Sequence, residues 1–162
     1  MKKKENLNTT LQKIITDCYQ KGCDYLGIIP YKKATFKGFY EKKLFQKVYD
    51  NEEILMNLEI NNSLRKKFFW AELQKLEAET AGITWPLNRE SWIMFNPVSW
   101  KTKSSEKLKD DLAEDVAHET AHAVIFNTDI NRGHEYPHKE LTKFLKYYLI
   151  SKHNLKELLW QE

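Results

Sequence analysis

The sequence has little cysteine, proline or glycine and contains no long hydrophobic run. Its 162 residues include two cysteines, Cys18 and Cys23, which are too few for a disulfide scaffold and lack the spacing of a zinc ribbon. No apolar stretch approaches the roughly 18 residues that a membrane-spanning helix requires. A polar stretch follows the basic N-terminal residues, so we expect no secretory signal. Five glycines and four prolines form no linker-like stretch, and the length predicts a single domain.

The chain is nevertheless rich enough in apolar residues to build a core. Hydrophobic residues make up 41% and aromatic residues 13%, a composition that excludes an intrinsically disordered or collagen-like protein. Periodicity and capping residues predict helices at residues 7–21 (ended by Gly22), 51–58, 63–80, 105–127 and about 137–151. Short strands are predicted at 83–87 and 91–95. Cys18 falls on the apolar side of the first helix, so we expect a buried, reduced thiol.

Lysine is concentrated in the N-terminal third of the chain. Residues 1–50 contain eleven lysines and five acidic residues, whereas the whole chain carries a formal charge of only +3. Between Tyr31 and Tyr49 the lysines are interleaved with aromatic residues, a pattern suited to single-stranded nucleic acid because lysines neutralise phosphates and rings stack on bases. The candidate contacts are Lys32, Lys33, Lys42 and Lys43. Alternatively, the aromatic residues form the buried face of a strand or helix and the lysines a solvated surface.

The strongest chemical signal is a His-Glu-x-x-His motif at residues 118–122, inside the best predicted helix. Residues four apart lie on one side of a helix, so His118 and His122 can both present an imidazole nitrogen to one metal ion. Glu119 is turned away by roughly 100°, from where its carboxylate can take a proton from water that the metal activates. The motif therefore predicts a zinc site with Glu119 as the general base.

A catalytic zinc ion takes three protein ligands and keeps one position open, so a third ligand must follow the motif. A metzincin would have glycine and histidine where this chain has Ile125 and Thr128, which excludes that class. His134 stands at the end of a polar loop, where the chain must turn back toward the helix, and it is our first choice. His138 and Glu140, near the start of the next predicted helix, are the alternatives.

The motif, the apolar turn that follows it to Phe126, a polar loop, Gly133-His134 and a helix together resemble the SprT-like (Spartan-type) zinc metalloproteases. The resemblance covers roughly residues 81–150. It implies Glu119 as general base, His118, His122 and His134 as zinc ligands, and substrates that are proteins bound or crosslinked to DNA. The chain departs from the family pattern at Glu135 and His138, where a small residue and an aromatic residue are usual, and it has no C-terminal zinc ribbon.

These observations predict an α+β, zincin-like domain in which a small antiparallel sheet packs on the His-Glu-x-x-His helix, with additional N-terminal and C-terminal helices. Residues 1–80 form a mainly helical N-terminal region and residues 81–150 the metalloprotease core. We expect a zinc-dependent peptidase acting on a protein or peptide substrate, with DNA as a further partner and no membrane. A cytoplasmic enzyme is expected, with nucleoid or nuclear association left open. The alternatives are a zinc hydrolase of a non-peptide substrate, and a non-catalytic nucleic-acid- or protein-binding module with a structural metal site.

Overall fold

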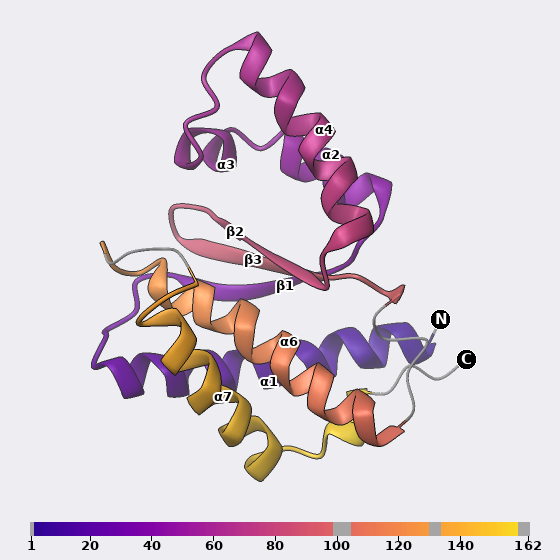
Figure 1. Cartoon of the computed structure of the whole chain (residues 1–162), viewed down its shortest axis with the longest axis vertical. Coiled ribbons are helices and arrows are strands. Elements are labelled where there is room, and N and C mark those ends of the chain that lie inside the picture. The colour runs from indigo at the N-terminus through magenta and orange to yellow at the C-terminus, as the bar shows by residue number, and fades with distance from the viewer. Residues whose placement is uncertain (1, 99–104, 130–133, 159–162) are drawn as a thin grey trace.

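A computed structural model describes residues 2–98, 105–129 and 134–158 of the chain (Figure 1). The fold is α+β, as predicted. Along the chain its elements are α1 (Lys2–Leu26), β1 (Lys33–Phe39), α2 (Lys42–Tyr49), α3 (Glu52–Asn57), α4 (Ser63–Glu79), β2 (Gly82–Pro86), β3 (Glu90–Phe95), α6 (Ser105–Ile125), α7 (His138–Lys152) and the 3-10 helix η1 (Leu155–Leu158). None of the described helices is both long enough and apolar enough to cross a membrane.

The strands of the described residues form one sheet in the order β1-β3-β2. Strand β2 pairs with β3 in antiparallel fashion, as a hairpin does. Strand β1 pairs with β3 in parallel. The prediction of an antiparallel sheet was therefore wrong in this respect, because it missed β1. The parallel pairing requires a long crossover between the two strands, and α2, α3 and α4 lie in that connection.

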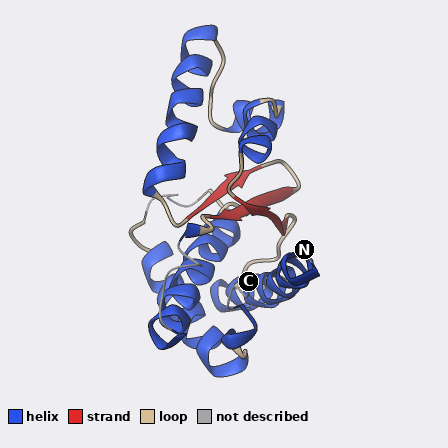
Figure 2. Ribbon diagram, turned by 90° about the vertical axis from the view of Figure 1, so that its right-hand side faces the viewer, coloured by secondary structure: helices blue, strands red, loops and turns tan. Residues whose placement is uncertain are grey.

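Side chains alternate between the two faces of the sheet, and helices cover both faces (Figure 2). Phe36, Ile93 and Phe95 face a hydrophobic cluster that includes buried residues of α1, α6 and α7. Trp92 and Met94 face a second cluster formed with residues of α2, α3 and α4. The N-terminal 80 residues thus supply one strand of the sheet, one helix of the first layer and all the described helices of the second layer.

Helix α1 is longer than predicted because Gly22 does not end it. The helix continues to Leu26 and stops before Gly27, whose φ of 67° is readily adopted by glycine. A Cβ atom at Gly22 would lie only 2.9 Å from Val124 Cγ2 and 3.3 Å from Leu145 Cδ1. Gly22 therefore allows α1 to pack closely against α6 and α7. Cys18 is a buried free thiol, as predicted.

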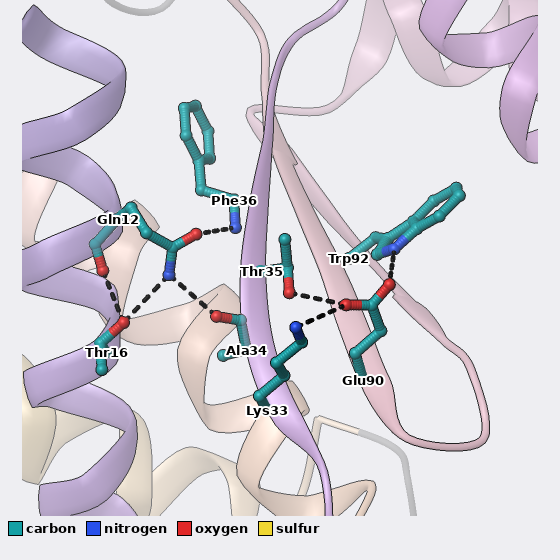
Figure 3. A network of polar contacts seen from close by, with 8 residues as sticks. All are labelled: Gln12, Thr16, Lys33, Ala34, Thr35, Phe36, Glu90 and Trp92. Atoms are coloured by element: carbon teal, nitrogen blue, oxygen red, sulfur yellow. Dashed lines mark hydrogen bonds and ion pairs between the residues drawn. The ribbon is translucent and has the colours of Figure 1, made fainter.

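The two edges of the sheet differ. At the β1 edge, the Gln12 side chain of α1 donates to the Ala34 carbonyl oxygen at 3.0 Å and accepts from the Phe36 amide at 2.7 Å (Figure 3). This amide satisfies backbone groups that an edge strand would otherwise expose. At the other edge, no strand of the described residues pairs with β2; the Asn57 side chain donates to the Pro86 carbonyl oxygen at 3.0 Å, and the strand borders the candidate site.

Polar contacts also join β1 to β3. Glu90 accepts hydrogen bonds from Trp92 Nε1 at 2.7 Å and from Thr35 Oγ1 at 2.9 Å, and its carboxylate lies 3.8 Å from Lys33 Nζ (Figure 3). Burial raises the pKa of Glu90, but the two hydrogen bonds and the nearby lysines outweigh burial, and the net pKa is lowered. This carboxylate therefore stabilises the parallel strand pair in its ionised form.

Candidate metal centre

Helix α6 carries the first two histidines one turn apart, with ring centroids separated by 4.9 Å. Both imidazoles are half-buried. The neighbouring Ala117, Ala121 and Ala123 are fully buried, and their small side chains allow the other sides of the helix to pack closely into the core. The local sequence thus forms a helix whose buried alanine side fixes the direction in which His118 and His122 point.

Two more histidines come from the segment after α6. The His138 side chain is only 2% exposed, at the first position of α7, whereas His134 is exposed. The His134 ring lies 5.0 Å from both the His118 and the His122 rings, measured between centroids. The His138 ring lies 4.6 Å from the His118 ring and 3.9 Å from the His122 ring. Four of the chain's five histidines therefore converge at one place.

His118, His122 and His138 could hold a metal ion, because one ligand nitrogen from each lies within 4.8 Å of the other two. His138 Nε2 also lies 3.0 Å from the backbone carbonyl oxygen of His118. Donation of the Nε2 proton to that carbonyl would leave Nδ1 with its lone pair available to an ion, and such a bond is typical of histidines around metals.

The separations between ring centroids can be compared for the two candidate third ligands, His134 and His138. With Zn–N distances of about 2.1 Å and tetrahedral angles, the centroids of two bound imidazoles lie about 5 Å apart. The three pairs within His118, His122 and His134 are at 4.9, 5.0 and 5.0 Å. The rings of His122 and His138 are 3.9 Å apart at an interplanar angle of 26°, so they lie face to face. The rings of His118 and His134 are also stacked, at an interplanar angle of 29°, so ring orientation does not distinguish His134 from His138 as the third ligand.

Three of the clustered histidines, His118, His122 and His138, are held in the neutral form that binds metals. Burial, followed by the neighbouring His138 and His134, lowers the pKa of His118 to about 4. Burial and the three surrounding histidines lower the pKa of His122 to about 3. Burial also lowers the pKa of His138, although its hydrogen bond to the His118 carbonyl acts in the opposite direction. Neutral imidazole is the ligating form, so these three residues need not lose a proton at neutral pH before binding an ion.

Glu119 lies against strand β2 and is only 5% exposed. The Thr84 hydroxyl donates to Glu119 Oε1 at 2.9 Å and lies 3.0 Å from the backbone carbonyl oxygen of Glu119. The other carboxylate oxygen, Oε2, lies 3.8 Å from Nε2 of His118. Burial raises the pKa of Glu119 to about 8. One oxygen is thus fixed by Thr84, and the second points toward the histidines.

Gly82 and Thr84 are the site residues that sequence reasoning missed. A Cβ atom at Gly82 would lie 2.9 Å from Glu119 Cγ and 2.9 Å from Phe95 Cδ1, so no other residue fits there without displacing one of these side chains. Thr84 contacts a residue 35 positions away. The only sequence signal was the place of Thr84 on the strand predicted at 83–87; Gly82 lies just before that range, and alternation along the observed β2 puts both residues on the same side.

A cleft of about 690 Å³ borders these groups. Its floor includes His118, Glu119, His122 and His134, and its remaining walls are mainly apolar residues of β2, the α3–α4 connection and α4. His138 is not among the residues that line it. Of the four clustered histidines, then, His138 lies behind the others and His134 lies beside the open space.

The remaining predicted residues lie elsewhere. Glu140 is exposed on the first turn of α7 and is not part of the histidine group. Lys33, Lys42 and Lys43 are exposed, whereas Lys32 is buried, with its Nζ near the rings of Tyr31 and Phe126. Four aromatic residues of the Lys-rich segment, namely Phe36, Phe39, Tyr40 and Phe45, are buried. These rings belong to the core and are not available to stack on bases; contact between the exposed lysines and nucleic acid stays a prediction.

Comparisons of the chain with models of known protein families, with curated proteins and with solved structures found no match.

Proposed function

We propose that this chain is a zinc-dependent peptidase in which His118, His122 and His134 hold the metal and Glu119 is the general base. The observation that carries the proposal is the placement of a buried carboxylate 3.8 Å from a half-buried imidazole, within a convergent group of histidines that borders a cleft of about 690 Å³. Three imidazoles beside open space suit a catalytic zinc ion, which needs three protein ligands and one free position. The resemblance to SprT-like proteases points to the same residues.

His138 is assigned a supporting position in this proposal. Its ring stacks on that of His122, and its Nε2 contacts the carbonyl oxygen of His118. Both contacts are to residues that hold the ion, so His138 would restrict the directions in which their rings point. The closeness of its ligand nitrogen to those of His118 and His122 makes it the competing third ligand.

When bound, a zinc ion supplies Lewis acidity, which activates water and polarises a carbonyl group. Glu119 takes the proton of the attacking water at Oε2, because Oε1 is engaged by the Thr84 hydroxyl. The same carboxyl group then gives the proton to the leaving amine. Glu119 must be ionised to begin this cycle; a cation among the neighbouring imidazoles favours the ionised form and opposes the effect of burial on its pKa.

A polypeptide is the substrate that the cleft suits best. All five residues of β2 line the cleft, and β2 is an edge strand of the described sheet. Backbone groups on an open edge can pair with an extended peptide, which is a common mode of peptide recognition. Pairing of this kind would place a peptide bond next to Glu119 and the histidines without requiring a particular sequence.

Replacement of the general base tests the proposal directly. The zinc-loaded protein should cleave a denatured protein such as casein, and a chelator should abolish the cleavage. Glu119→Gln should keep its zinc and its fold but lose at least about 100-fold in rate, as expected for loss of a general base. Retention of full cleavage by Glu119→Gln would refute the assigned chemistry. If this variant retains zinc and the protein's biological effect, the site is structural and the chain is a binding module.

A further inference from the structure

A second cavity, of about 700 Å³, lies between α4, the α3–α4 connection and Trp85 of β2. We call it the α4 pocket; its apolar lining includes Leu58, Ile60, Phe68, Phe69, Leu76 and Trp85. Leu58, Leu76 and Trp85 also line the cleft of the metal centre. The two cavities are therefore adjacent, with these three side chains at their common border.

The alternation of β2 relates the α4 pocket to the metal centre. Gly82 and Thr84 point toward Glu119 on α6, as their contacts show. Ile83 and Trp85 pack on the opposite side, in the hydrophobic cluster shared with α2, α3 and α4. A peptide paired with the outer edge of β2, beyond the Pro86 carbonyl oxygen that Asn57 engages, would alternate in the same way, because side chains of paired strands share the pleat of the sheet. One of its residues would face the metal centre while the adjacent residues faced the α4 pocket.

The chemistry of the α4 pocket favours an apolar occupant. Phe68 is 65% exposed at this pocket, although it is a large aromatic residue on a helix with ample polar surface. The charged residues around it, Glu59, Arg65, Glu72 and Lys75, include two of each sign, so the rim does not select for one charge. Arg65 is already engaged, because its Nη1 donates to the carbonyl oxygen of Glu59 at 2.9 Å.

From this geometry we infer that the α4 pocket binds a bulky apolar side chain, such as phenylalanine or leucine, of an extended polypeptide substrate, next to the residue whose peptide bond is cleaved. The inference rests on the proposed peptidase function, and it adds a preference in substrate sequence. Residues 58–76, which line the pocket together with Trp85, would then select substrates rather than only cover the sheet.

Peptide binding to the metal-free protein tests the pocket without relying on catalysis. Two fluorescent ten-residue peptides of serine, glycine and threonine, one with a central phenylalanine and one with serine at that position, would be titrated with wild-type protein in chelator, with anisotropy as the readout. The phenylalanine peptide should bind about tenfold more tightly, since burial of much of an aromatic side chain is worth at least this factor. Phe68→Ser should remove most of the preference. The matched control is Ile150→Ser, which changes an apolar side chain that is 50% exposed on α7. This variant should keep the preference for the phenylalanine peptide.

The outcomes separate the two proposals. Equal binding of both peptides, no binding of either, or the same loss in the Ile150→Ser control would overturn the α4 pocket as a recognition site. Cleavage of the two peptides would then be compared with zinc-loaded protein. A preference in binding that depends on Phe68, without zinc-dependent cleavage of any peptide, would refute the peptidase function while the pocket stands. Cleavage of both peptides with equal kcat/KM and equal affinity would refute the pocket while the peptidase stands.

Discussion

Removal of His134 and of His138, one at a time, should affect zinc binding very differently. The ring separations place His134 at the distance from His118 and His122 that a shared tetrahedral ion requires. His138 instead stacks on His122 and contacts the His118 carbonyl oxygen. We therefore expect His134→Ala to lose a ligand and His138→Ala to lose only a support for two ligands.

The magnitudes follow from these two roles. Zinc sites with four ligands bind the ion with about 10–16 kcal/mol, which is roughly 2.5–4 kcal/mol for each ligand. Loss of one ligand therefore corresponds to a fall in affinity of about 100- to 1000-fold. Loss of a residue that orients ligands costs about 10- to 100-fold. His138→Gln, which keeps an N–H donor near the His118 carbonyl, should recover part of the loss seen in His138→Ala.

The zinc affinity of each variant would be measured by competition with a chromophoric chelator at pH 7. Substitution with cobalt gives a second readout, because the visible absorption of Co²⁺ depends on its coordination geometry. The spectrum should change in His134→Ala and stay like that of the wild type in His138→Ala. The reasoning from ring geometry would be refuted if His138→Ala showed the larger loss and the altered spectrum while His134→Ala kept both wild-type properties.

Three further predictions concern the residues around the site. Glu90→Gln should lower the free energy of unfolding by about 1–2 kcal/mol at pH 7, because hydrogen bonds to a charged group are weakened. Since the pKa of Glu90 is lowered in the folded state, its contribution is fully present above the unfolded pKa of about 4.3 and is lost as the pH falls through the folded-state pKa, so the difference between urea melts of variant and wild type should shrink as the pH is lowered below that unfolded value. Gly22→Ala should destabilise the protein by about 1 kcal/mol, because the cost of overpacking, about 1–3 kcal/mol, exceeds the roughly 1 kcal/mol gained in helix propensity. The control Lys13→Ala, on the exposed side of the same helix, should change thermal stability little. A Gly22→Ala variant more stable than the wild type would contradict the close packing of α1. Gly82→Ala should displace the Glu119 carboxylate and lower the peptidase rate at least about tenfold while zinc content is unchanged. Full activity in this variant would show that the close contact between β2 and the Glu119 side chain is not needed.

Local patterns were enough to predict most of the helices and the hairpin. The His-Glu-x-x-His spacing is a property of one helix, so the convergence of His118 and His122 could be read from the sequence alone. Strand β1 could not, because its partner β3 lies 55 or more residues away and parallel pairing leaves no turn between the strands. The same limit applies to Thr84, whose bond to Glu119 depends on how β2 packs against α6. Gly22 was misread because a helix-ending glycine and a close-packing glycine look alike until the neighbouring helices are known.

One side chain at the end of α6 bears on how the metal centre forms. Asn127 Oδ1 accepts from the backbone amides of Tyr31 and Lys32, at 3.2 and 3.1 Å, and its Nδ2 donates to the Tyr19 hydroxyl at 2.7 Å. The helix that carries two imidazoles is thereby anchored to α1 and to the entry of β1, independently of any ion. Folding alone fixes this end of the helix, so capture of a metal should involve little rearrangement of α6 and should be fast.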